Sequence, residues 1–141
     1  MILAFAYTPI AFKTTLKSVE RIGMNSLQDA VGWLDDGSPT CRIPRLRKRE
    51  GRCYELALRG CLKASEWELV HGECIDKFGN RIGHAWLEFD GEAYCPVLDN
   101  CMASVFFYKK LQATTITRYS MIEALIMHLH HQHAGPWHDE A

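Results

Sequence analysis

The chain lacks a strong excess of either charge and has no long apolar run. Its 141 residues hold 16 Lys and Arg against 17 Asp and Glu, so the formal net charge is −1. Such a balance gives no general argument for nucleic acid or an anionic membrane as a partner. No apolar run approaches the roughly 20 residues that cross a bilayer. The apolar opening MILAFAY lacks a basic stretch and a small-residue cleavage site, so we expect mature structure there and no signal peptide.

The paired cysteine motif of common zinc sites is also missing. No two of the six cysteines form a CxxC pair, which argues against a zinc ribbon or a treble clef. Their density is low for a small secreted fold held by disulfides. We therefore expect a reduced, cytoplasmic protein without cofactor or metal, in which most thiols are small core side chains. The six are Cys41, Cys53, Cys61, Cys74, Cys95 and Cys101.

What the sequence does contain is enough for one ordinary globular domain over 1–141. Hydrophobic residues make up 48% of it, and no internal repeat or low-complexity tract is present. A capping box, Ser120 with Glu123, marks the start of the last helix. The expected parts are an N-terminal helical part (1–40), a Cys/His core (51–99) and a C-terminal helix (120–134).

Two stretches of the core, HAWLEF and EAYCPV, are joined by Asp90-Gly91 and have the pattern of a β-hairpin. Asp-Gly suits a two-residue type I′ turn, which sets Phe89 opposite Glu92. Strand alternation then places a row of side chains on one face of the hairpin. The row is His84, Trp86, Cys95, Val97 and Asp99. We expect Glu88 to face solvent.

A cysteine stands where a helix begins. From Cys53, small and apolar side chains recur at helical spacing as far as Cys61. Backbone N–H groups at the first turn and the arginine-rich run at 42–52 would both lower the pKa of the Cys53 thiol. A thiolate needs an imidazole to stabilise it and to protonate a leaving group, and His84, fixed on a strand, is the candidate. Helix, small antiparallel sheet and closing helix together predict an α+β domain.

These residues resemble the transglutaminase-like branch of the papain-like thiol enzymes. The resemblance covers 51–99 and rests on the helix-opening cysteine, the strand start HAW at 84–86 and the hairpin partner YCP at 94–96. Small cysteine proteases that remove leader peptides in lasso-peptide maturation are similar in size and share the HAW element. The resemblance implies a papain-like core, in which a central Cys-bearing helix packs on a small antiparallel sheet. It also implies Cys53 as the nucleophile and His84 as the general base and acid.

The third residue of that family's site departs here. The family usually has an aspartate directly before the proline of the second strand, where this chain has Cys95. Three interpretations remain: Asp99 orients His84 from the next inward position, the pair works without an acid, or the domain has lost catalysis. Cys95 is then either a core thiol or the partner of Cys53 in a regulatory disulfide. No glutamine shortly precedes Cys53, which leaves the backbone N–H of Cys53 as the oxyanion donor.

The sequence therefore predicts a thiol-dependent hydrolase or acyltransferase that acts on peptide or protein amide bonds through Cys53, His84 and Asp99. The alternative is a catalytically inactive fold used as a protein-binding module. The arginine-rich run at 42–52 has the composition of a solvated loop. Its functional alternative is a docking surface for an acidic peptide or a nucleic acid strand, and the absence of interleaved aromatic residues makes the argument for nucleic acid weak. A transition-metal site on the histidine-rich tail is a further alternative, although no acid or cysteine completes it. The tail histidines are His128, His130, His131, His133 and His138.

Overall fold

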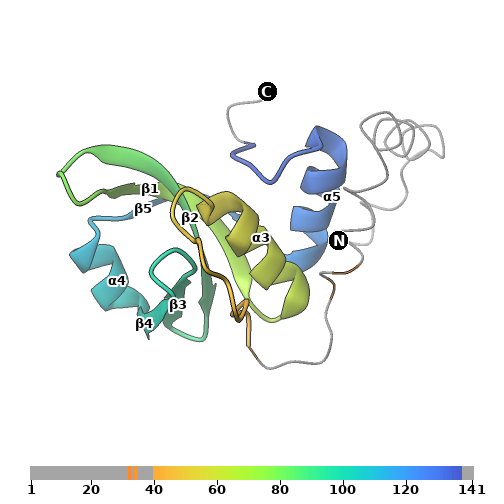
Figure 1. The fold of residues 1–141 in the computed structure, drawn as a ribbon, viewed down its shortest axis with the longest axis horizontal. Helices are drawn as coiled ribbons and strands as arrows, with labels where there is room; N and C mark the ends of the chain where they lie inside the picture. Colours follow the sequence, from red (N-terminus) through yellow and green to blue (C-terminus); the bar gives the residue numbers. More distant parts are fainter. Residues whose placement is uncertain (1–31, 33, 35–39, 138–141) are drawn as a thin grey trace.

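A five-stranded antiparallel sheet organises the protein (Figure 1). The computed structural model describes residues 32, 34 and 40–137. The strands follow the order β4-β3-β2-β1-β5, so β2 lies in the middle with a neighbour on each side. They are β1 (Glu68–Ile75), β2 (Arg81–Phe89), β3 (Glu92–Cys95), β4 (Asn100–Ala103) and β5 (Thr114–Tyr119).

Three helices accompany the sheet in the described part of the chain, which confirms the α+β class. They are α3 (Cys53–Lys63), α4 (Ser104–Lys110) and α5 (Met121–His131). The expected capping box is present: Ser120 accepts the N–H of Glu123, and the Glu123 carboxylate accepts the N–H of Ser120. The helix ends at His131, short of the expected 134, because Gln132 adopts the left-handed conformation with φ 66°. The helical part expected over 1–40 lies outside the described residues, apart from 32, 34 and 40.

The hairpin formed by β2 and β3 has the predicted register. Asp90 and Gly91 both have positive φ, 49° and 78°, as a type I′ turn requires. Phe89 lies opposite Glu92, and the pairing continues to Leu87 opposite Tyr94. Because the side-chain period of a strand is two, this register decides which residues reach each face of the sheet.

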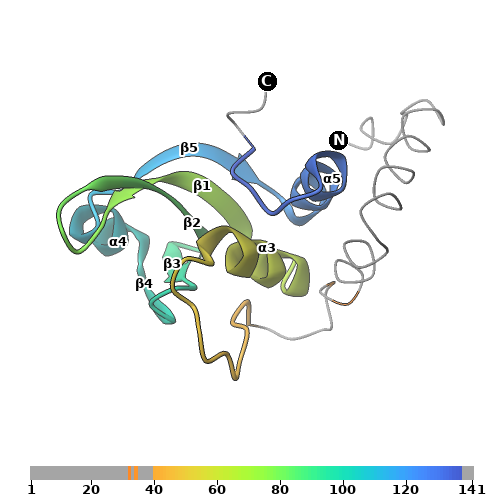
Figure 2. The same ribbon diagram turned by 45° about the horizontal axis from the view of Figure 1, so that its top comes forward.

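The two faces of the sheet carry separate hydrophobic cores. Side chains from α3 and α5 pack on the face that bears Leu69, Ala85 and Leu87. Phe107 of α4 packs on the opposite face, against Trp86. In Figure 2, α3 and α5 lie next to each other, and α4 stands apart from them beyond β3 and β4.

Helix α3 approaches β2 very closely at Gly60. A Cβ atom built on Gly60 would lie 2.6 Å from the carbonyl oxygen of Cys41 and 2.6 Å from Cδ1 of Leu87. The carbonyl belongs to the backbone and cannot move aside as a flexible side-chain end would. This glycine therefore sets the separation between the helix that begins at Cys53 and the strand that carries His84.

We expect Gly60→Ala to destabilise the protein by about 1–3 kcal/mol, since overpacking outweighs the roughly 1 kcal/mol that alanine gains in helix propensity. Urea unfolding monitored by tryptophan fluorescence measures the change. Glu66→Ala, at an exposed position just after α3, serves as the control and should stay within about 0.5 kcal/mol of the parent. A Gly60→Ala protein as stable as the parent would contradict the close contact.

Candidate active site

Cys53 is the first residue of α3, as the sequence predicts. Gly51, with φ 77°, turns the chain into the helix. The preceding residue, Arg52, caps α3 without a side-chain hydrogen bond, so no side chain occupies the helix N-terminus through this cap. The thiol of Cys53 is free and its residue is half-buried. The Cys53 thiol therefore lies at a helix N-terminus that is not capped by the side chain of its N-cap residue.

The point where β3 leaves β2 brings this thiol to the sheet. In a hairpin closed by a two-residue turn, Phe89 and every second residue before it direct their backbone groups towards β3. Ala85 belongs to this series, but β3 ends at Cys95 and leaves the Ala85 N–H without a strand partner on that side. The N–H of Ala85 instead acts on the thiol of Cys53 and lowers its pKa. Ala85 directly follows His84, so the start of α3 lies at the end of β2 that carries the predicted base, while the His84 side chain lies on the other face of the strand with Trp86.

His84 is buried on β2, and its ring is held from one side. Its Nε2 lies 3.4 Å from the Sγ of Cys95 across the hairpin. The ring also stacks on Trp86, with centroids 6.0 Å apart and an interplanar angle of 27°. Among the described residues, His84 makes its side-chain hydrogen bond with Cys95 and not with Cys53. The contact uses Nε2, so Nδ1 is the ring nitrogen that is left for other chemistry.

Burial sets the protonation of both groups. It lowers the pKa of His84 to about 4, so the imidazole is neutral at pH 7. Burial also raises the pKa of the Cys53 thiol, and the backbone N–H groups of Ala85, Tyr54 and Cys53 lower it by less. The expected lowering of this pKa is therefore wrong, because desolvation outweighs the helix start. The site rests as a neutral thiol beside a neutral imidazole.

Cys95 occupies the position beside His84 where the family resemblance places an aspartate. Its residue is 1% exposed, and burial raises the pKa of its thiol while the N–H groups of Leu98 and Val97 lower it by less. Besides burial, the thiols of Cys95 and Cys53 raise the pKa of Cys74, and the thiol of Cys53 raises the pKa of Cys95. All three thiols are free. The thiol at position 95 can hold the ring nitrogen, but it carries no charge that would stabilise an imidazolium.

Asp99 has other partners than the sequence predicts. Its two carboxylate oxygens accept hydrogen bonds from Nε and Nη2 of Arg42, at 2.7 and 2.8 Å. Tyr94 donates its hydroxyl to the same carboxylate at 2.6 Å, and Arg49 lies 3.7 Å away. The hydrogen bond from Arg42 holds the pKa of Asp99 at about 2. Within the described residues, Asp99 thus ties down the loop before α3 and makes no contact with His84.

Glu88 is buried, and the expectation that it faces solvent is wrong. Its residue is 8% exposed, and it accepts a hydrogen bond from Nε1 of Trp86 at 2.7 Å. Tyr108 of α4 and Arg118 of β5 also donate to its carboxylate. Strand alternation is the signal that could have found it, since Glu88 shares a face with Trp86 and His84. The carboxylate fixes the indole that stacks on His84.

The described part of the chain contains neither a metal-binding cluster nor a membrane-spanning helix. No group of three His, Cys, Asp or Glu side chains lies close enough together there to hold a metal ion, which includes the tail histidines up to 133. His128 instead contacts the backbone carbonyl of His133 through Nδ1, at 3.2 Å. His138 lies outside the described residues. None of the described helices has both the length and the apolar character to cross a membrane.

Comparison of this chain with protein-family models, with curated proteins and with solved structures finds no match.

We expect Asp99→Asn to lower the melting temperature by a few degrees, because it weakens the charge-assisted bonds to Arg42. The pH profile of Cys53 alkylation should stay in place, since Asp99 does not touch His84. Thermal melting and peptide mapping after iodoacetamide treatment measure the two effects. A profile that moves in Asp99→Asn would return this carboxylate to the role of orienting His84.

Proposed function

We propose that this chain is a thiol-dependent hydrolase or acyltransferase that acts on peptide or protein amide bonds. Cys53 is the nucleophile and His84 is the general base and acid. The domain takes the papain-like, transglutaminase-like arrangement, with the Cys-bearing helix α3 packed on the antiparallel sheet. The observation that supports the proposal is the interaction of the Ala85 N–H with the Cys53 thiol, because Ala85 directly follows His84 on β2.

The neutral resting pair determines how the first step proceeds. Because Nε2 of His84 is engaged with Cys95, Nδ1 accepts the proton of the Cys53 thiol as the sulfur attacks the carbonyl carbon. The oxyanion that forms takes a hydrogen bond from the backbone N–H of Cys53. Collapse of this intermediate breaks the C–N bond, and the imidazolium of His84 gives its proton to the departing amine. The product is a thioester on Cys53 and a free amine.

The second step restores the enzyme. Neutral His84 takes a proton from water, or from an acceptor amine, while that nucleophile attacks the thioester carbonyl. The C–S bond then breaks, and the imidazolium returns the proton to the sulfur of Cys53. Water gives a carboxylic acid, and an amine gives a new amide. Both acceptors use the same two residues.

A competing function is a protein-binding module that keeps this architecture without catalysis. Cys95 favours it, because a neutral thiol stands where a carboxylate would stabilise the imidazolium. The low pKa of His84, about 4, points the same way, since the imidazolium that catalysis needs is disfavoured by burial. Catalysis by this pair is accordingly expected to be slow beside that of a triad with an acid.

Reaction with p-nitrophenyl acetate tests the proposal. We expect a burst of p-nitrophenolate and an acetyl group on Cys53, detected by mass spectrometry after peptide mapping. Cys53→Ala removes the burst, and His84→Ala slows acetylation of Cys53 by about 100-fold, because the general base is lost. Cys101→Ala, which removes an exposed thiol away from the site, serves as the control and leaves the burst intact. Equal acetylation of Cys53 in His84→Ala would exclude the pair and favour the binding module.

The identity of residue 95 gives a second prediction. Cys95→Asp should raise the pKa of His84 and shift the alkylation profile of Cys53 by about one pH unit or more towards acid, since a carboxylate favours the thiolate–imidazolium pair. Cys95→Asn is the matched control, because it introduces a similar shape without charge. Iodoacetamide alkylation of Cys53 across pH measures both variants. If both fold and their profiles coincide, the charge at position 95 is not coupled to the pair.

A further inference from the structure

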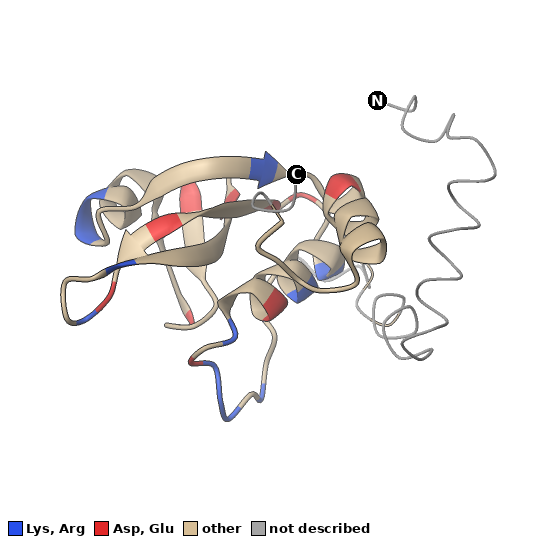
Figure 3. Ribbon diagram, turned by 90° about the horizontal axis from the view of Figure 1, so that it is seen from above, with Lys and Arg blue, Asp and Glu red and all other residues tan. Residues whose placement is uncertain are grey.

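Six basic residues lie in the loop before α3, which we call the arginine-rich loop (42–52). They are Arg42, Arg45, Arg47, Lys48, Arg49 and Arg52. Figure 3 shows this loop as a stretch rich in blue that projects from the molecule at the start of α3. Three of the six bind other groups of the protein, and the other three form no ion pair with any described residue.

Three of the arginines anchor the loop. Arg42 is paired with the carboxylate of Asp99. Arg49 donates to the backbone carbonyls of Ile43, at 2.5 Å, and of Pro96, at 3.1 Å. The bonds to Asp99 and Pro96 fasten the loop to the segment that follows Cys95.

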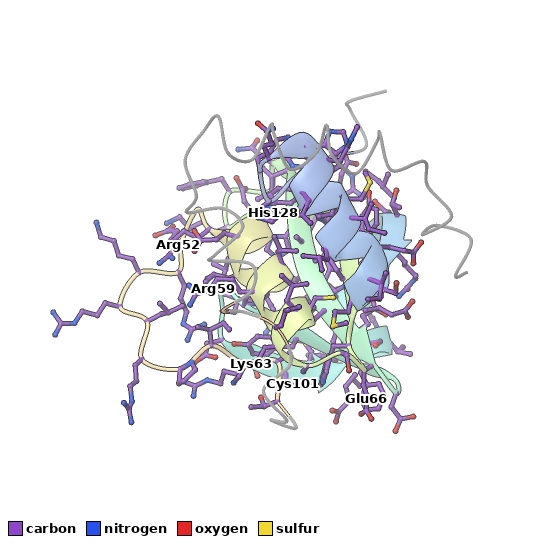
Figure 4. All side chains as sticks on the ribbon, turned by 90° about the vertical axis from the view of Figure 1, so that its right-hand side faces the viewer. Arg52, Arg59, Lys63, Glu66, Cys101 and His128 are labelled. Atoms are coloured by element: carbon purple, nitrogen blue, oxygen red, sulfur yellow. The ribbon has the colours of Figure 1, made fainter. Side chains whose placement is uncertain are left out.

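The third anchor closes the loop on its other side. Arg52 donates to the carbonyl of Lys48 at 2.9 Å and pairs with Glu55 of α3 at 2.6 Å. Figure 4 places Arg52 beside α3, with Arg59 and Lys63 farther along the same side of the helix. The loop is therefore held at both ends, next to the start of the helix that carries Cys53.

The remaining three cations, Arg45, Arg47 and Lys48, are exposed and form no ion pair with any described residue. Long side chains with nitrogen ends reach out from this loop in Figure 4. Internal bonds that already fix a loop reduce the conformational entropy that is lost when a partner binds to it. Charges presented in this way attract an acidic partner and speed its association.

The distance to Cys53 fits a peptide that would reach the site. Lys48 is five residues before Cys53, so at most about 18 Å of chain separates them. An extended peptide covers that distance in about five or six residues. We propose that Arg45, Arg47 and Lys48 dock an acidic segment of a peptide or protein substrate, and that the part of it which meets Lys48 lies within about five residues of the bond that Cys53 attacks. This inference rests on the proposed function, because it assigns the substrate class of the same site.

A peptide fits this surface better than a nucleic acid. Single-stranded nucleic acid binds to basic grooves in which aromatic side chains stack on the bases. The arginine-rich loop contains no aromatic residue, and its apolar members are Ile43, Pro44 and Leu46. The carboxylates of an acidic peptide bind to cationic side chains and need no aromatic side chain.

Two peptides with an N-terminal iodoacetyl group test the docking. One has about five neutral residues followed by a run of glutamates, and its partner has glutamines in place of the glutamates. At low salt we expect the glutamate peptide to alkylate Cys53 on the order of tenfold faster, with the ratio falling towards one at high salt. The triple variant Arg45→Gln/Arg47→Gln/Lys48→Gln should lose this ratio. Lys77→Gln/Lys109→Gln/Lys110→Gln, which removes three exposed cations elsewhere, should keep it.

Each outcome separates docking from chemistry. Plain iodoacetamide has no acidic segment to dock, so it should alkylate Cys53 at equal rates in both triple variants. A ratio near one in the parent protein, or an equal loss in the two triple variants, overturns the docking proposal and leaves the proposed function standing. If p-nitrophenyl acetate leaves Cys53 unacetylated, the proposed function fails, and fluorescence anisotropy with an unreactive glutamate peptide still measures docking. Tighter binding of a single-stranded oligonucleotide than of that peptide also overturns the proposal.

Discussion

The two-residue turn at Asp90-Gly91 is the constraint on which the rest of the site depends. It fixes the register of β2 and β3, and the register puts Cys95 within reach of Nε2 of His84. The same register leaves the Ala85 N–H beyond the end of β3, where it acts on the thiol of Cys53. A slip of one residue in this pairing would take the Cys95 side chain to the opposite face of the sheet and separate it from Nε2 of His84.

Desolvation decides the chemistry once these groups are together. A helix N-terminus stabilises a thiolate, but the burial of Cys53 raises the pKa of its thiol by more than the nearby N–H groups lower it. Burial also lowers the pKa of His84 to about 4, and Cys95 offers no charge to oppose that shift. The proposed pair therefore rests as a neutral thiol and a neutral imidazole. The arginines that were expected to lower the pKa of Cys53 bind Asp99, Glu55 and backbone carbonyls, or face solvent.

Short sequence patterns predicted most of the turns and helix starts that position the site, but they could not predict contacts between residues far apart in the sequence. The Asp-Gly turn, the capping box at Ser120 and the helix start at Cys53 each follow from a few neighbouring residues, and all three are present. The partners of Asp99 could not be predicted, because Arg42 lies 57 positions away and pattern alone does not say which carboxylate it meets. The prediction of a lowered pKa for Cys53 was wrong for a related reason, since burial depends on how the whole domain packs.

The tautomer of His84 tests the central claim most directly. Nitrogen-15 NMR of the imidazole at pH 7 should show Nε2 protonated, facing Cys95, and Nδ1 unprotonated and available to the thiol of Cys53. Cys53→Ala should then move the chemical shift of Nδ1 and leave that of Nε2 nearly unchanged. A ring protonated at Nδ1, or an Nδ1 signal indifferent to the loss of Cys53, would show that the two residues do not form a working pair.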